Sequence, residues 1–211
     1  TEDDDQVQLV VVTKTFPASD ISLLAELGVT DVGENRDQEG RAKRSGVRSD
    51  ELRWHMIGRL QRNKVSSVAR WADIVESIDR HELIAPLAGA VERFDRKPVQ
   101  VLLQVSLDPM PDPGRGGIDP NDVESLAEAV AGHEALHLAG VMAVAPHPDT
   151  GVNPRAAFDR LYEISALVRA SWPNAREISA GMSSDLEAGV AAGATQVRIG
   201  GAILGERPPV Q

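Results

Sequence analysis

Short apolar segments alternate with longer amphipathic segments along the whole chain. Continuous apolar runs between turn residues are typical of strands in a parallel sheet, whereas apolar residues that recur every three to four positions indicate helices. We predict strands at Leu9–Thr13, Asp31–Glu34, Arg53–Ile57, Ile74–Ile78, Val99–Val105, Leu138–Val144, Glu177–Ala180 and Gln196–Ile199. Helical patterns lie between them, among them Ile21–Leu27, Gln61–Ala69, His81–Phe94, Val123–Ala131, Pro154–Ala170 and Asp185–Ala192.

Several of these helices are preceded by residues that commonly cap a helix N-terminus. The candidates, in chain order, are Ser19 or Asp20, Asp122, Asn153 followed by Pro154, and Ser184.

Eight strands separated by seven helical segments are the count of a single (β/α)8 TIM-type barrel. An open doubly wound sheet is the alternative, but it rarely carries eight evenly spaced βα units in 211 residues. No Gly/Ser linker or charged block divides the chain, so we assign residues 9–211 to one barrel and residues 1–8 to an acidic N-terminal tail. The tail has neither the basic nor the apolar region of a targeting signal.

The composition narrows the class of protein. A formal net charge of -10 disfavours a nucleic-acid binder, which normally carries a basic face. No apolar stretch approaches the roughly 20 residues that a membrane-spanning helix needs. Cysteine is absent, which excludes disulfides and thiolate chemistry. We expect a cytoplasmic protein, and a monomer, because the sequence shows no obvious large apolar surface patch.

Lys14 is the strongest candidate for chemistry. It follows the apolar run Leu9–Thr13, so a buried strand would carry its amine to the mouth of the barrel, where the active sites of such barrels lie. A partly desolvated lysine loses its proton more readily, and a neutral amine can form a Schiff base. The alternative is a strand-end lysine that only extends its amine into solvent.

The loops after the last two predicted strands have the chemistry of a phosphate site, which (β/α)8 barrels often build at this place. The first loop contains Met182 and Ser183, and the second contains Gly200 and Gly201. Glycines let backbone amides approach an anion closely, and a serine hydroxyl can donate to it. Taken alone, Gly200-Gly201 favours a tight turn that closes the barrel, but the two loops together favour a phosphate site.

Arg198 is predicted to point into the barrel, because alternation along the last strand puts Gln196, Arg198 and Gly200 on one face. A buried arginine needs an acceptor. That acceptor is either a ligand or a strand-end carboxylate such as Glu34.

Five motifs in the same order give the chain a resemblance to a known family. They are Val12-Thr13-Lys14-Thr15, Gly33-Glu34-Asn35, Trp54-His55-Met56-Ile57-Gly58 with Leu60-Gln61 and Asn63-Lys64, Gly181-Met182-Ser183-Ser184-Asp185, and Val197-Arg198-Ile199-Gly200 with Gly205-Glu206-Arg207. On these motifs, which span nearly the whole chain, the protein resembles the pyridoxal phosphate homeostasis protein family. That family is a single-domain relative of the alanine racemase N-terminal barrel, of PLP fold type III.

The resemblance implies pyridoxal 5'-phosphate (PLP) as cofactor. The implied contacts are Lys14 for a Schiff base with PLP, Ser183 with the Gly200 and Gly201 amides for the phosphate, Arg198 for the pyridine nitrogen, and Asn35, His55 and Met182 for the ring. A cation at the pyridine nitrogen keeps that nitrogen unprotonated and weakens the electron sink that carbanion chemistry needs.

The chain departs from the family pattern at two places. Members usually have a helical segment before the first strand, which is missing or cut short here. They commonly have a hydroxyl residue where this chain has Gly201. We therefore expect the phosphate to depend more on backbone amides and on Ser183.

Three functions are compatible with these residues. The resemblance implies a PLP carrier or regulator in cofactor homeostasis, with PLP-dependent apo-enzymes as candidate partners and no catalytic residues. The alternative is an amino-acid racemase or a related single-domain fold-type III enzyme. A racemase needs a second acid/base, which in alanine racemase comes from a C-terminal β domain, whereas this chain ends at Gln211 and has its only tyrosine, Tyr162, in a predicted helix. A third possibility is a Schiff-base aldolase that acts on a phosphorylated sugar without PLP.

Two other features are weaker. His133-Glu134-Ala135-Leu136-His137 matches the H-E-x-x-H zinc pattern, which requires one continuous helix. Gly132 is predicted to end the helix before it, so we expect no metal site. His147 and Arg115 lie in predicted loops near the barrel mouth, where each reaches a ligand or solvent.

Overall fold

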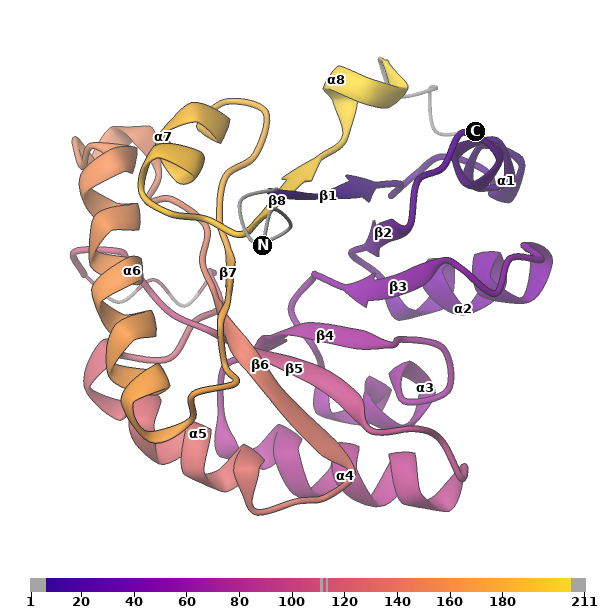
Figure 1. The fold of residues 1–211 in the computed structure, drawn as a ribbon, viewed down its shortest axis with the longest axis horizontal. Helices are drawn as coiled ribbons and strands as arrows, with labels where there is room; N and C mark the ends of the chain where they lie inside the picture. Colours follow the sequence, from indigo (N-terminus) through magenta and orange to yellow (C-terminus); the bar gives the residue numbers. More distant parts are fainter. Residues whose placement is uncertain (1–6, 111, 113, 206–211) are drawn as a thin grey trace.

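The computed structural model describes residues 7–110, 112 and 114–205. Eight parallel strands follow one another around a closed barrel, and β8 pairs with β1 to complete it (Figure 1). The strands are β1 Gln8–Val12, β2 Asp31–Glu34, β3 Arg53–Met56, β4 Ile74–Ile78, β5 Val99–Gln104, β6 Leu136–Met142, β7 Glu177–Ser179 and β8 Gln196–Ile199. The closed sheet confirms the (β/α)8 barrel and excludes the open doubly wound alternative.

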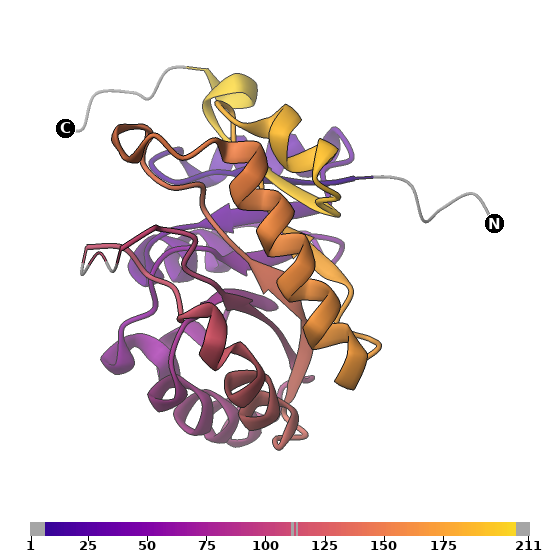
Figure 2. The same ribbon diagram turned by 90° about the vertical axis from the view of Figure 1, so that its left-hand side faces the viewer.

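Helices follow the strands and cover the outside of the barrel, with the 18-residue α6 running across one side (Figure 2). The α-helices are α1 Ala18–Glu26, α2 Asp37–Gly46, α3 Val65–Val68, α4 Ile84–Arg93, α5 Val123–Ala131, α6 Pro154–Ser171, α7 Leu186–Ala191 and α8 Gly201–Leu204. Four 3-10 turns complete the set, η1 Arg62–Lys64, η2 His81–Leu83, η3 Pro120–Asp122 and η4 Pro148–Thr150. Within the described ranges, no helix is both long enough and apolar enough to cross a membrane.

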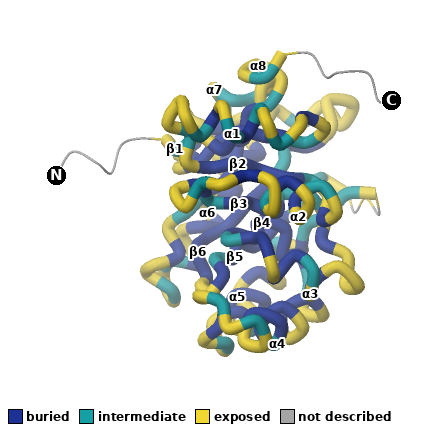
Figure 3. Tube along the Cα trace, turned by 90° about the vertical axis from the view of Figure 1, so that its right-hand side faces the viewer, coloured by how far each residue is buried: buried dark blue, intermediate teal, exposed yellow. Residues whose placement is uncertain are grey.

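The apolar core lies between the strands and the surrounding helices. The strands are buried along most of their length, and exposure is concentrated on the outer turns (Figure 3). Trp54, Trp71 and Phe158 are among its largest fully buried side chains. Gly40 brings α2 against this core, because a Cβ at that position would lie 2.5 Å from the ring of Trp71.

Strand β6 differs most from its predicted bounds, since it begins at Leu136 and not at Leu138. Its register with β5 shifts so that Leu102 pairs with Gly140. Gly140 has a φ of +159°, and a Cβ there would lie 1.9 Å from the carbonyl oxygen of Glu177. The glycine therefore permits an irregularity that an apolar pattern does not reveal.

Two of the predicted caps are wrong. Helix α1 begins at Ala18 with Pro17 as its N-cap, so Ser19 and Asp20 lie inside the helix. Helix α7 begins at Leu186, and the residue before it is Asp185, not Ser184.

Of the other two predicted caps, one is confirmed and the other lies at the predicted position without a capping hydrogen bond. The Asn153 side chain accepts from the Arg155 amide at 2.8 Å, which confirms the cap of α6. Asp122 precedes α5 as predicted, but its side chain makes no capping hydrogen bond; Asp119 caps the preceding η3 turn instead. Residues 1–6 of the predicted acidic tail lie outside the described residues, and β1 already begins at Gln8.

Candidate functional site

Lys14 lies in the turn that follows β1, at the C-terminal end of the barrel, and is partly buried. The neighbouring Thr15 has a φ of +71°, a conformation that a β-branched residue rarely adopts. Its amide donates to a carboxylate oxygen of Glu39 in α2 at 3.0 Å. The turn that carries Lys14 is therefore held in an uncommon backbone conformation by contacts from outside β1.

A buried ion pair between Lys43 and Glu34 contacts Thr13, the residue that precedes Lys14. Lys43 donates to the Thr13 carbonyl oxygen at 2.9 Å and to Oε1 of Glu34 at 2.8 Å. The Thr13 hydroxyl donates to the same oxygen of Glu34 at 2.5 Å. Burial raises the pKa of Glu34 despite these donors. Its other oxygen, Oε2, is buried without a hydrogen-bond partner in the described part of the chain.

Arg198 points into the barrel, as predicted, and is almost completely buried. Its guanidinium donates to the Ser179 hydroxyl at 2.5 Å and to the Ala143 carbonyl oxygen at 2.8 Å, and it lies 3.7 Å from Oε2 of Glu76. The suggested pairing with Glu34 is wrong, because Glu34 is occupied by Lys43. The two hydrogen bonds use two of the five donors of a guanidinium, so the group can still donate to a ligand.

His55 occupies the centre of a charged network inside the barrel. Its ring nitrogens lie 2.6 Å from Oε1 of Glu76 and 2.8 Å from Oδ1 of Asp31, and the side chain is completely buried. Burial alone would lower the pKa of His55, but the hydrogen bonds to the two carboxylates raise it to about 9. Burial alone would raise the pKa of Asp31, which the hydrogen bond from His55 helps to lower to about 2. A role for His55 at a cofactor ring stays a prediction.

One of the two predicted phosphate loops, the loop after β8, contacts the end of β1. Gly200 packs against β1, since a Cβ there would lie 3.2 Å from the Val12 carbonyl oxygen. Helix α8 starts at the next residue, Gly201, where a Cβ would meet nothing within 4 Å. The amides that begin α8 therefore border open space next to the strand that leads to Lys14.

The other loop presents hydroxyl groups. Ser183 and Ser184 are exposed and line a cavity of about 380 Å³ in front of α7. The Met182 amide donates to Oδ1 of Asp185 at 2.6 Å, which fixes the path of this loop.

Asn35 follows β2 and is packed against the loop after β3. A Cβ on Gly58 would lie 2.1 Å from the Asn35 carbonyl oxygen, so only glycine allows this approach. Asn35 and Met56 together line a cavity of about 290 Å³. Asn35 is thus positioned by the Gly58 motif, at the same end of the barrel as Lys14.

These residues fit a phosphorylated aldehyde such as PLP. The mouth offers a lysine amine after β1, glycine amides at the start of α8 with open space before them, and a buried arginine in β8. Sequence reasoning missed Lys43, Glu76 and the interior role of Ser179. A signal existed for Glu76, which is the only charged residue in the strand Ile74–Ile78.

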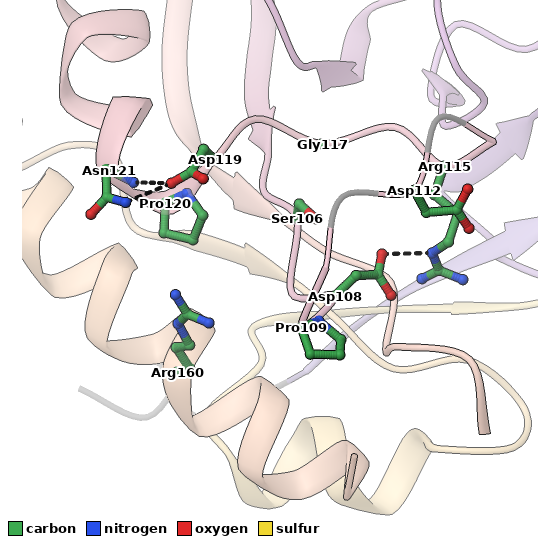
Figure 4. Close-up of a pocket in the computed structure, with 10 residues that line it drawn as sticks. All are labelled: Ser106, Asp108, Pro109, Asp112, Arg115, Gly117, Asp119, Pro120, Asn121 and Arg160. Atoms are coloured by element: carbon green, nitrogen blue, oxygen red, sulfur yellow. Dashed lines mark hydrogen bonds and ion pairs between the residues drawn. The ribbon is translucent and has the colours of Figure 1, made fainter. Parts of the chain in front are cut away.

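A larger cavity of about 390 Å³ lies beside the loop after β5 and includes none of the predicted cofactor residues (Figure 4). Within it, Arg115 pairs with Asp108 at 2.9 Å and also donates to the Ala145 carbonyl oxygen at 2.7 Å. Arg115 therefore ties this loop to the segment after β6. Arg160 of α6 and the Asp119–Asn121 turn form the opposite wall.

The histidines of the zinc-like motif do not share a helix. Helix α5 ends at Ala131 with Gly132 as its C-cap, and His137 lies in β6. Among the described residues, no group of three potential ligands could hold a metal ion. His147 caps the η4 turn by accepting from the Asp149 amide at 3.3 Å.

Comparison with known proteins identifies the family of this barrel. A family model for the alanine racemase N-terminal domain matches residues 4–208. The pyridoxal phosphate homeostasis protein of Mycobacterium tuberculosis (strain ATCC 25618 / H37Rv) is 40% identical over 220 residues, covering 96% of this chain and 83% of that protein. The corresponding protein of Corynebacterium glutamicum is 40% identical over 208 residues, covering 96% and 91%. The chain belongs to the pyridoxal phosphate homeostasis protein family.

Solved structures of the family have the same fold. PipY of Synechococcus elongatus PCC7942 without PLP matches with a TM-score of 0.83 and 32% identity, over 92% of this chain and 90% of PipY. PipY with PLP bound matches with a TM-score of 0.81 and 31% identity, over the same shares. Alanine racemase of Clostridium difficile 630 matches with a TM-score of 0.75 at 13% identity, which shows a shared barrel and no more.

Proposed function

We propose that this protein binds PLP at the barrel mouth and acts in PLP homeostasis as a cofactor carrier or regulator. The observation that supports the proposal is that three features lie toward the C-terminal ends of the strands: the Lys14 turn after β1, the glycine amides at the start of α8, and the buried Arg198 in β8. The names of the relatives and the PLP-bound structure of PipY support it. PLP-dependent apo-enzymes are the proposed recipients.

Each residue has a distinct task in this proposal. PLP supplies an aldehyde that condenses with an amine, and a phosphate that needs hydrogen-bond donors. Lys14 provides the amine, because its turn is fixed by Glu39 and Lys43 at the end of β1. Ser183 and the Gly200 and Gly201 amides hold the phosphate. Asn35, His55 and Met182 stay proposed neighbours of the ring.

Arg198 disfavours transamination. A permanent cation, held in place by Ser179 and Ala143, keeps a proton off an acceptor nitrogen that it contacts. Without that proton the bound cofactor is a weaker electron sink. We therefore propose that the protein is poorly equipped for transamination, and that PLP bound here is stored and delivered.

Spectroscopy and covalent trapping test the proposal on the purified protein. After incubation with PLP, we expect a visible absorbance band and, after borohydride reduction, one PLP adduct that mass spectrometry assigns to Lys14. Lys14→Ala should fold normally and lose the adduct, whereas Lys64→Ala, which removes an exposed lysine near the mouth, should retain it. An adduct that persists on another lysine of the Lys14→Ala protein contradicts the assignment.

The same preparation distinguishes the alternative functions. With L- or D-alanine, the PLP-loaded protein should racemise no faster than free PLP, and rapid racemisation would establish the enzyme. Absence of any PLP band would leave Lys14 and the phosphate loops to a Schiff-base aldolase.

A further inference from the structure

A cavity of about 290 Å³ opens beside the predicted cofactor site and shares Asn35 with it. It lies between the first turn of α2 and the segment that follows β3. Its lining residues are Asn35, Arg36, Asp37, Gln38, Met56, Arg59, Gln61 and Lys64. The cofactor contacts described above use only Asn35 from this set.

The cavity is cationic in a protein whose net charge is -10. Three cations and one carboxylate line it. That carboxylate, Asp37, is 8% exposed and accepts a hydrogen bond from the indole of Trp71 at 3.1 Å, so it is already engaged in the core. The remaining lining charges are all positive.

The side chains of these cations reach solvent, and the ion pairs of the two arginines described below are long. Arg36 is 81% exposed and lies 3.8 Å from Glu39. Arg59 is 54% exposed and lies 3.9 Å from Asp79. Lys64 is exposed and makes no ion pair with any residue that the structure describes. Exposed ion pairs at such distances contribute little to stability.

The donors suit a phosphate group better than a single carboxylate. Two guanidinium groups and one ammonium match the double charge of a phosphate monoester, and arginine can bind phosphate oxygens through two parallel hydrogen bonds. The side-chain amides of Gln38 and Gln61 add neutral donors at the same cavity.

We propose that this cavity binds the phosphate group of a small phosphate monoester, as a site separate from Lys14. The ligand is either a second molecule of PLP or another phosphorylated metabolite, since both present the same group. The proposal does not depend on the covalent attachment of PLP, because none of the three cations belongs to the cofactor site. Its position at Asn35 places a bound anion next to that site.

Nuclear magnetic resonance of the Lys14→Ala protein provides a direct test. Titration with inorganic phosphate at low ionic strength should shift the side-chain amide signals of Gln38 and Gln61. Arg59→Gln/Lys64→Gln in the same background should weaken this binding by about tenfold or more, since the variant removes two of the three cations that line the cavity. Asp79 keeps its ion pair with Arg80 in that variant.

A matched control removes the same number of charges elsewhere. Arg48→Gln/Lys97→Gln alters two exposed cations that do not line the cavity and should leave the shifts and the affinity within about twofold. Equal weakening in both double variants, or no shift of the two glutamine signals, would overturn the proposal. Failure of Lys14 to carry PLP would not, because the test uses a protein without that lysine.

The identity of the ligand follows from three further probes. PLP carries both a pyridine ring and a phosphate, pyridoxal carries only the ring, and ribose 5-phosphate carries only the phosphate. Binding of PLP alone supports a second cofactor molecule, and similar binding of PLP and ribose 5-phosphate supports a general phosphate monoester site. Binding of pyridoxal as tightly as PLP would contradict recognition of the phosphate.

Discussion

Two buried glutamates at different depths of the barrel show opposite electrostatic behaviour. Glu76, in the interior, has partners on both oxygens: His55 and Gln196 at Oε1, and Ser179 with Arg198 at Oε2. Burial alone would raise the pKa of Glu76. The hydrogen bond and charge of His55, together with the charge of Arg198 and the hydrogen bond from Ser179, lower it below its ordinary value.

Glu34, at the mouth, has donors on one oxygen only. Thr13 and Lys43 both donate to Oε1, and Oε2 has no partner among the described residues. Burial therefore dominates, and the pKa of Glu34 is raised. The number of donors, not the depth of burial, decides which carboxylate is fixed in its charged form.

The comparison separates a scaffold from a site. The interior network is nearly saturated with hydrogen bonds and holds Arg198 in one orientation. The mouth contains an unsatisfied oxygen, a positive φ at Thr15, and the Lys14 turn. Such incomplete satisfaction and backbone strain are characteristic of functional regions.

The largest expected effect comes from neutralising each glutamate in turn. Glu76→Gln leaves the His55 and Arg198 cations without their shared carboxylate and should lower the free energy of unfolding by about 3–5 kcal/mol. Glu34→Gln removes a carboxylate that is less favoured in its charged form and should cost about 1 kcal/mol. Urea unfolding at pH 7 measures both. Equal losses would mean that the two environments are energetically equivalent.

The pH dependence of stability tests the interior network without a mutation. The pKa of His55 is raised from 6.5 to about 9, so its contribution is fully present below pH 6.5 and is lost as the pH rises through 9. That difference corresponds to about 3 kcal/mol. The raised pKa values of Glu34 and Glu177 act in the same direction, beginning at lower pH. Unfolding free energies that stay constant from pH 6.5 to 9.5 would contradict a charged His55.

Lys43→Met tests whether the Lys43–Glu34 ion pair stabilises the barrel mouth and positions the Lys14 turn. The change leaves the Thr13 carbonyl oxygen and the Glu34 carboxylate without their buried donor, and should lower the free energy of unfolding by about 1–3 kcal/mol. PLP retention should fall as well, because the Lys14 turn loses its support. The exposed Lys97→Met serves as control for the loss of one charge.

A double variant separates stability from positioning at the mouth. Lys43→Met/Glu34→Leu replaces the ion pair by apolar side chains and should recover most of the stability. PLP retention should stay low, since the Thr13 carbonyl oxygen still lacks a donor. Full recovery of PLP retention would show that Lys43 does not position the turn.

The sequence predicted the barrel well because strand and helix patterns alternate along the whole chain, although a short strand such as β2 (Asp31–Glu34) carries no continuous apolar run. It failed for helix α2, whose buried residues are Asp37, Gly40 and Lys43 and therefore show no apolar periodicity. Gly40 has no side chain and therefore lets the helix pack against Trp71, and the second core contact is made by the buried Lys43. Neither is visible until Trp71 and Glu34 are known to lie beside it.

The candidate site was predictable where a residue follows a strand directly, as Lys14 and Gly200 do. The partners of Arg198 were not predictable, because they depend on closure of the barrel. Ser179 reaches Glu76 across 103 positions of the chain, and Gln196 reaches it across 120. An inward-facing polar residue indicates that a hydrogen-bond partner exists, but only the closed barrel determines which residue that partner is.

The smallest expected effect concerns Gly201, where the family resemblance led us to expect a hydroxyl residue. A Cβ at this position would meet nothing within 4 Å, so Gly201→Ser should change the free energy of unfolding by less than about 0.5 kcal/mol. The new hydroxyl adds one donor at the start of α8 and should slow the loss of PLP during dialysis by a few fold, roughly the effect of one hydrogen bond. Gly58→Ser is the contrasting variant, because its Cβ would lie 2.1 Å from the Asn35 carbonyl oxygen and must disturb the mouth. If Gly201→Ser leaves the rate of PLP loss unchanged while the protein stays stable, the start of α8 does not hold the phosphate, and the phosphate site must then be sought at the Ser183 loop.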